Sequence, residues 1–241
     1  MPVPWKRRSF IAAMGSTASA VFLDPRLGSL PTLPPEVRPA IKVIGVGGAG
    51  CSVLDYLTVL GVDSTSFVAV DSDLDRLDRS MVATRIQIGR RLLNGLGAAA
   101  HWENGYRAAV EDLATLSHQL DGARRVILTC GLGGGIGGGA TPVIAHAARR
   151  VCGAEVWAVS AQPVRAEGVK CRSNADHALD TLRWAADHLA TVSFPESLAH
   201  WLPYDIACFE RAADMAEHVL RVMSPWRELL GALSQHVTPS R

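Results

Sequence analysis

A glycine run set between two apolar segments limits the possible folds of this chain more than any other part of its sequence. Seven of the nine residues from 131 to 139 are glycine. The run follows Val126-Ile127-Leu128-Thr129, which predicts a buried strand, and precedes Thr141-Pro142, a pair typical of an N-cap and first helical residue. An ordered glycine costs about 0.5–1 kcal/mol relative to alanine, and a flexible linker would not lie inside a strand–helix unit. We therefore interpret the run as backbone that cradles an anion.

A second glycine loop, Gly45–Gly50, joins a predicted strand at 41–46 to a predicted helix at 51–60. The helix N-terminus would supply unpaired N–H groups to a phosphate. Gly45, Gly47 and Gly50 match the dinucleotide fingerprint, and Asp71 stands where a ribose-binding acid belongs. An NAD(P)-binding oxidoreductase is therefore one candidate. The presence of two glycine loops favours a triphosphate, because a dinucleotide site uses one, and neither loop continues as the Gly-Lys-Ser/Thr of a P-loop.

The rest of the chain alternates between strand-like and helix-like segments. Short apolar runs predict strands at 41–46, 67–70, 85–88, 126–129, 156–159 and 190–194. Helical spacing predicts helices at 51–60, 103–120, 141–152, 167–189 and 205–223. This alternation predicts an α/β fold: a three-layer, Rossmann-like parallel sheet with helices on both faces and right-handed crossovers.

Composition excludes several other classes. The net charge is +1 with 20% charged residues, so we expect no nucleic-acid or anionic-membrane partner. No apolar run reaches the length of a membrane-spanning helix. The number of cysteines, five, is odd, which favours reduced thiols and therefore a cytoplasmic location. No two of them lie at metal-ligand spacing, so we expect no metal site.

The first 39 residues differ from the rest in character. Residues 24–39 are rich in proline and predict a linker. Before them, Lys6-Arg7-Arg8, a short apolar stretch and Ala18-Ser19-Ala20 have the layout of a secretory signal and resemble a twin-arginine signal. The alternative is a disordered tail, and cytoplasmic residence stays our expectation.

The two glycine loops together resemble the FtsZ/tubulin GTPase family, the bacterial FtsZ branch in particular. The segments that carry the likeness are Lys42–Gly48, Phe67–Asp73, Ile86–Gly89, Gly95–Ala98, Gly133–Ala145, Pro163 and Glu167-Gly168. The resemblance implies GTP or GDP as ligand with Mg²⁺ as the accompanying cation. It also implies a GTPase domain at 40–223, preceded by an extension at 1–39 and followed by a short tail at 224–241.

The resemblance further implies a set of nucleotide-binding residues. The phosphate contacts would come from Gly47, Gly48, Ala98, Gly133, Gly134, Gly135, Ile136, Gly137, Gly138 and Gly139. Ala49, Gly50, Cys51 and Asp73 would also belong to the nucleotide-binding site. Pro163 and Glu167 would lie at the sugar. Asp214 would recognise guanine, or Glu217 under another alignment. The resemblance assigns no catalytic residue and no metal ligand within the chain.

Several positions depart from the family pattern. Ile136 and Gly138 stand where the family has two threonines, so two hydroxyls that could serve phosphate or Mg²⁺ are missing. Cys51 replaces an asparagine, Ala99 a glycine and Cys171 an arginine. Each lost hydrogen bond is worth roughly 0.5–3 kcal/mol, so we expect weaker GTP binding than in the family.

The largest departure lies at the end of the chain. The family continues into an acidic loop, which positions the attacking water in the next subunit, and then into a C-terminal domain. This chain ends at Arg241 without that pattern. We therefore expect weak hydrolysis unless a partner completes the site, and an effect on filaments of full-length FtsZ, or self-association. The remaining alternatives are the NAD(P) oxidoreductase and an interaction module that binds no nucleotide.

Overall fold

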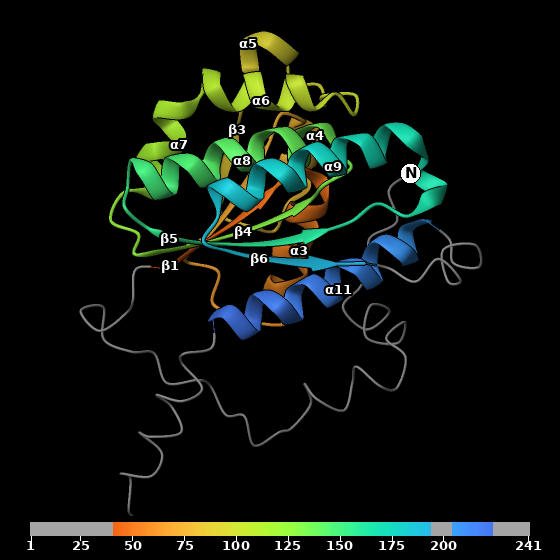
Figure 1. Ribbon diagram of the computed structural model, residues 1–241. Helices are drawn as coiled ribbons and strands as arrows, with labels where there is room; N and C mark the ends of the chain where they lie inside the picture. The colour runs from red at the N-terminus through yellow and green to blue at the C-terminus, as the bar shows by residue number, and fades with distance from the viewer. Residues whose placement is uncertain (1–40, 194–203, 224–241) are drawn as a thin grey trace, which may run out of the picture. The chain divides into compact units, whose positions relative to one another are not determined.

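The computed structural model describes residues 41–193 and 204–223 (Figure 1). The predicted extension at 1–39, the tail at 224–241 and the end of the last predicted strand lie outside these residues. The described strands form one six-stranded, fully parallel sheet in the order β3-β2-β1-β4-β5-β6. They are β1 (Ile41–Val46), β2 (Phe67–Asp71), β3 (Thr84–Gln87), β4 (Arg125–Gly131), β5 (Glu155–Ala161) and β6 (His188–Val192). This confirms the predicted fold class.

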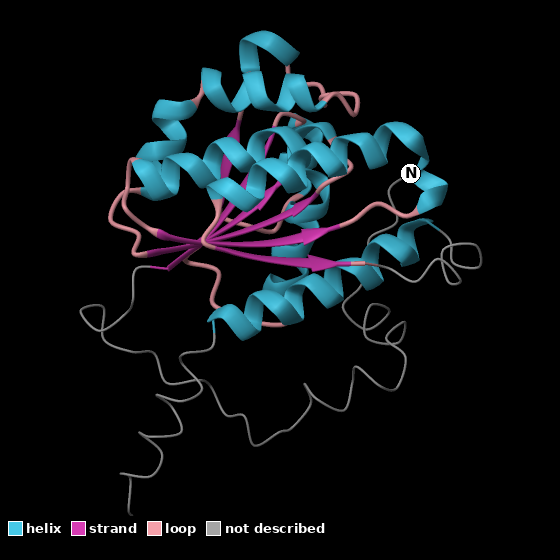
Figure 2. Cartoon of the chain, in the orientation of Figure 1, coloured by secondary structure: helices cyan, strands magenta, loops and turns pink. Residues whose placement is uncertain are grey.

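The central strands are buried on both faces, as their continuous apolar runs predict. Every residue of β2 is buried, as are the five central residues of β4. Helices cover both faces of the sheet (Figures 1 and 2). One face carries α3 (Gly47–Val59), α4 (Leu74–Arg79) and α11 (Tyr204–Met223). Helices α3 and α11 contact each other, and Ser80, the C-cap of α4, donates a hydrogen bond to Asp55 of α3. The other face carries α5 (Arg90–Leu93), α6 (Trp102–Glu111), α7 (Leu113–Leu120), α8 (Gly135–Arg150), η2 (Arg165–Glu167) and α9 (Gly168–Ala185).

The start of α8 corrects the sequence-based prediction. Thr141 and Pro142 were expected to open this helix, but α8 begins six residues earlier, at Gly135. Thr141 lies inside it, and its Oγ1 donates to the Gly137 carbonyl at 2.6 Å. The glycines of α8 are helical despite their poor helix propensity, because tertiary packing overrides propensity. Their backbone is packed so closely that a Cβ on Gly137, Gly138 or Gly139 would clash.

Two other boundaries also differ from the prediction. The expected helix at 103–120 is divided into α6 and α7 at Asp112, whose Oδ2 accepts the Gly89 N–H at 2.7 Å. The expected helix at 167–189 ends at Ala185, because Asp187 already pairs with Val156 of β5 through a 2.9 Å N–H to carbonyl bond. Strand β6 therefore begins two residues earlier than expected.

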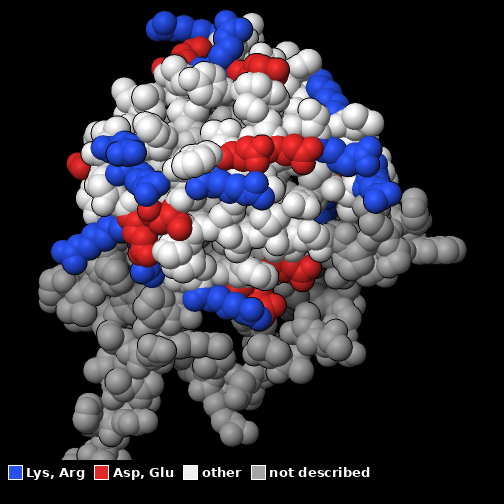
Figure 3. Space-filling model, in the orientation of Figure 1, with Lys and Arg blue, Asp and Glu red and all other residues white. Residues whose placement is uncertain are grey.

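No helix among residues 41–193 and 204–223 is long and apolar enough to cross a bilayer. On the face displayed in Figure 3, basic and acidic side chains are interspersed. This mixture agrees with the near-neutral net charge of the sequence.

Candidate functional site

The strand order places the two glycine loops side by side. Connections from β1 lead toward β2 and those from β4 lead toward β5, so the chain changes direction between β1 and β4. Such a switch point leaves a crevice at the carboxyl edge of a parallel sheet, where ligands bind. Val46 and Cys130 are in register near the ends of the two strands, so both loops begin at this edge.

The first glycine segment is shorter than predicted, because β1 ends at Val46 and α3 begins at Gly47, four residues before the predicted helix start at 51. The φ of +69° at Gly47 is a left-handed conformation that favours glycine. A Cβ on Gly47 would lie 2.8 Å from the backbone nitrogen of Gly137, and one on Gly131 would lie 2.9 Å from the Cβ of Ala49. The N-termini of α3 and α8 therefore touch. No side chain caps either of them, so their first N–H groups and dipoles converge on the crevice.

The second glycine run divides into packing positions and one open position. A Cβ on Gly137, Gly138 or Gly139 would collide with the carbonyl oxygen of Gly131, Leu132 or Trp102, respectively. Gly134, the N-cap of α8, is exposed, and a Cβ there would meet only the Gly131 oxygen at 3.8 Å. Gly134 is thus the position of the run where a side chain would enter the crevice.

Other predicted nucleotide-binding residues lie around these two helix starts. Ala98 is buried, and a Cβ on Gly135 would lie 2.8 Å from the Cβ of Ala98. Ala49 is exposed, Gly50 packs beneath the loop against the Thr129 carbonyl, and Ile136 is buried.

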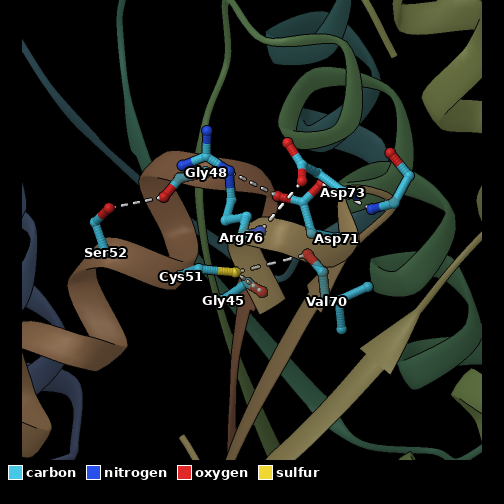
Figure 4. Close-up of polar contacts among 9 residues, drawn as sticks. Gly45, Gly48, Cys51, Ser52, Val70, Asp71, Asp73 and Arg76 are labelled. Atoms are coloured by element: carbon cyan, nitrogen blue, oxygen red, sulfur yellow. Dashed lines mark hydrogen bonds and ion pairs between the residues drawn. The ribbon is translucent and has the colours of Figure 1, made fainter. Parts of the chain in front are cut away.

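The thiol of Cys51 faces the protein interior. Its Sγ lies 3.6 Å from the Gly45 carbonyl oxygen and 3.8 Å from that of Val70 (Figure 4). Burial, together with the nearby carboxylates of Asp71 and Asp55, raises the pKa of this thiol far above its usual value. Cys51 therefore supports the loop as a neutral thiol beneath it.

Two side chains of α9 that no sequence motif indicated hold the loops together. Asn174 is buried, and its Nδ2 donates to the Ala100 carbonyl at 2.8 Å and the Gly133 carbonyl at 3.1 Å. The Nζ of Lys170 donates to the Ala99 carbonyl at 3.2 Å. Ala99 and Ala100 have φ values of +51° and +53°, so this loop is held in a strained conformation. A lone asparagine on a predicted helix carries no signal that could have revealed this role.

The predicted sugar-side residues lie beyond β5. A Cβ on Gly133 would be 3.1 Å from the Cβ of Pro163, so this proline borders the second loop. Glu167 Oε1 accepts the Val164 N–H at 3.2 Å and forms an ion pair with Arg211 of α11 at 2.5 Å. The pair joins the loop after β5 to α11.

Asp214 lies one helical turn beyond Arg211 and is exposed. Partial burial and the nearby Glu217 raise its pKa above the usual range. Glu217 is a further turn along α11, where it forms an ion pair with Arg221. Because Arg211 reaches Glu167, Asp214 is nearer along the helix to the sugar-side residues than Glu217 is.

The turn after β2 brings two carboxylates and an arginine to the same edge (Figure 4). Asp71 is buried, and its Oδ1 accepts the N–H groups of Ser72 at 2.7 Å and Asp73 at 3.2 Å. Its Oδ2 lies 3.4 Å from Nε of Arg76. Both oxygens of Asp71 are therefore engaged within the protein. A ribose hydroxyl would have to displace one of these contacts, which disfavours the dinucleotide alternative.

A magnesium ion bound with a nucleotide takes one or two protein carboxylates and completes its shell with phosphate oxygens and water. The described residues contain no cluster of three or more His, Cys, Asp or Glu side chains that could hold a metal by themselves. Asp73 Oδ1 accepts the Arg76 N–H at 3.1 Å, and its Oδ2 has no hydrogen bond among the described residues. A cation held mainly by phosphates would fit this site, and Asp73 would be its protein contact.

Comparison with known proteins gives a consistent match. Residues 40–197 match the Tubulin/FtsZ family, GTPase domain. The chain is 39% identical over 157 residues to cell division protein FtsZ 1 of Archaeoglobus fulgidus, covering 65% of this chain and 42% of that protein. It is 35% identical over 185 residues to cell division protein FtsZ of Caulobacter vibrioides, covering 77% of this chain and 36% of that protein. The chain spans less than half the length of these relatives.

Solved structures of FtsZ and CetZ proteins are also similar to this chain. An empty FtsZ dimer from M. jannaschii superimposes with a TM-score of 0.71 and 30% identity, covering 77% of this chain and 54% of that chain. CetZ2 from Haloferax volcanii, a GTPγS-bound protofilament, superimposes with a TM-score of 0.66 and 25% identity, covering 83% of this chain and 60% of that chain.

Proposed function

Because the chain belongs to the tubulin/FtsZ family through its GTPase domain, we propose that it binds GTP and GDP at the β1–β4 switch point. The observation that carries the proposal is the convergence of two uncapped helix N-termini, those of α3 and α8, on one crevice. Their unpaired N–H groups and dipoles attract phosphate without any basic side chain. Mg²⁺, when bound with the nucleotide, would neutralise phosphate charge, with Asp73 as its protein contact.

The nucleotide would lie across the carboxyl edge of the sheet. Its phosphates would meet the first turns of α3 and α8, with Gly134 at the open position. Pro163 and Glu167 would border the sugar, and Asp214 would accept hydrogen bonds from guanine. The ion pair between Arg211 and Glu167 supports this arrangement, because it links the sugar-side loop to the helix that carries Asp214.

We further propose that hydrolysis by this chain alone is slow and that its nucleotide face meets an FtsZ subunit. Ile136 and Gly138 bring no hydroxyl to the first turn of α8, so water and cation positioning there lack two hydrogen-bonding groups. The relatives described as a dimer and a protofilament support assembly through such domains. The cytoplasm, where GTP and reduced thiols coexist, is the compartment we propose.

The first prediction is selective binding of guanine nucleotides. Fluorescent GTP titrated into the protein should be displaced by GTP and GDP but not by equal concentrations of ATP or NAD. Gly134→Val should weaken binding at least tenfold, because its side chain would occupy the phosphate crevice. The φ of −79° and ψ of 156° at this position suit valine, so the thermal unfolding temperature should stay close to that of the wild type.

The competing functions give different results in the same titration. Displacement of fluorescent GTP by NAD at the concentration at which GTP displaces it would favour the oxidoreductase. Absence of binding by any nucleotide would favour an interaction module. Normal GTP binding by Gly134→Val would show that the N-terminus of α8 is not part of the nucleotide site.

A further inference from the structure

The side chain of Arg76 lies directly over the first turn of α3. A Cβ on Gly48 would be 2.6 Å from Nη1 of Arg76 and 2.7 Å from its Cζ. The guanidinium therefore packs on the Gly48 backbone, as Figure 4 shows. The side chain is 45% exposed, so solvent and solutes reach it.

This is an unfavourable place for a cation unless an anion joins it. The first turn of α3 carries the partial positive charge of the helix dipole, which repels a guanidinium. Asp71 offsets this repulsion through its contact with Nε at 3.4 Å. Among the described residues, neither Nη1 nor Nη2 has a hydrogen-bond acceptor. Two donor nitrogens are thus left at the positive end of a helix, where a phosphate would accept from them.

The position of Arg76 also indicates which phosphate it would meet. The sugar-side residues Pro163 and Glu167 follow β5, whereas Arg76 follows β2, on the other side of the β1–β4 switch point. A nucleotide with its sugar beside Glu167 and its phosphates across the helix N-termini ends beside Arg76.

We propose that Arg76 binds the terminal phosphate of GTP and makes the site prefer GTP to GDP. The inference rests on the proposed nucleotide site and adds a residue that sets its phosphate specificity. The guanidinium supplies a fixed positive charge to a site that lacks hydroxyls at Ile136 and Gly138. Retention of GTP therefore depends less on Mg²⁺ than it would without Arg76.

The test compares the affinities of fluorescent GTP and GDP for the wild type, Arg76→Gln and Arg76→Lys, each with Mg²⁺ and with EDTA. Arg76→Gln should weaken GTP binding roughly tenfold, as expected for loss of a hydrogen bond to a charged group, and GDP binding by less than about threefold. The loss should be larger in EDTA. Arg76→Lys should recover part of the GTP affinity, because it keeps the charge but loses the planar fork.

Arg79→Gln is the matched control, since Arg79 is an exposed arginine in the same short helix. It should leave both affinities unchanged. Equal losses for GTP and GDP in Arg76→Gln, no loss for either, or tighter GTP binding would each overturn the inference while leaving the proposed site intact. A wild type that binds no guanine nucleotide would instead refute the proposed function itself.

Discussion

At the scale of single residues, Asp71 shows how the site uses a buried charge. Burial raises the pKa of its carboxyl group, and the hydrogen bonds from Asp73 and Ser72 and the charge of Arg76 offset only part of the rise. The carboxylate orders the turn after β2 and holds the guanidinium that lies on Gly48. The turn is therefore maintained at some cost in folding free energy whenever Asp71 is ionised.

This cost predicts a pH dependence. A folded-state pKa above the unfolded value means that the native state keeps a proton that the unfolded chain has lost. The contribution of Asp71 to stability therefore falls as pH rises from the unfolded pKa through the higher folded one. Asp71→Asn keeps an acceptor for the two N–H groups and removes the titration. Its free energy of unfolding, relative to wild type, should increase between about pH 4 and pH 7, an interval that starts near the usual Asp pKa.

Urea denaturation across this interval measures the difference. A difference that stays constant with pH, or falls as pH rises, would contradict a raised pKa at Asp71.

At the scale of elements, the packing of α6 on α8 explains much of the glycine run. The two helices meet backbone to backbone: a Cβ on Gly139 would collide with the Trp102 carbonyl, and one on Gly105 with the Gly135 carbonyl. The glycine run therefore has two different roles. Gly135 and Gly139 let α6 approach α8, while Gly134, the N-cap of α8, leaves the crevice open.

This division predicts opposite outcomes for two similar substitutions. Gly139→Ala gains about 1 kcal/mol of helix propensity but forces a methyl group into backbone that cannot move aside, which costs roughly 1–3 kcal/mol or more. We expect a net loss of stability. Gly134→Ala adds its methyl group in open space and should change the free energy of unfolding by less than about 1 kcal/mol.

Chemical denaturation followed by circular dichroism compares the two variants under the same conditions. A Gly139→Ala protein at least as stable as the wild type would show that α6 and α8 can separate without cost.

At the scale of the whole molecule, the candidate site lies at one edge of the sheet and collects residues from most of the chain. The loops after β1, β2, β4 and β5 all open there. Asn174 of α9 links the loop after β4 to the Ala100 carbonyl, and Arg211 of α11 pairs with Glu167 after β5. The contact with an FtsZ subunit that we propose would use this edge, where nucleotide would be bound.

The corresponding prediction concerns filaments. Added below stoichiometry to polymerising FtsZ from the same cell, the protein should change filament length in electron micrographs and GTP turnover in the mixture. Gly134→Val, which should lose nucleotide, is the control and should have less effect. Unchanged length and turnover at several-fold excess of the wild-type protein would contradict the proposed contact.

Local sequence was sufficient for the order and type of most elements. Buried parallel strands need continuous apolar runs, so residues 67–70 and 126–129 identify β2 and β4 without any tertiary information. The glycine segment between a strand and a helix was predicted as well, although α3 begins at Gly47 and not at the predicted residue 51. Local sequence could not place the start of α8, since Thr141-Pro142 carries capping signals that the surrounding packing overrides.

The parallel α/β fold and the two glycine loops follow from the amino-acid sequence alone, because both depend on local patterns of burial and backbone freedom. The separate roles of the glycines within those loops emerge only in the folded structure. That Gly139 packs while Gly134 stays open depends on the distant Trp102 carbonyl. That Asn174 bridges two loops and Arg76 covers Gly48 depends on helices brought together by the sheet. Contacts between residues far apart in the chain produce no periodic pattern in the amino-acid sequence. They can therefore be identified only from the folded structure.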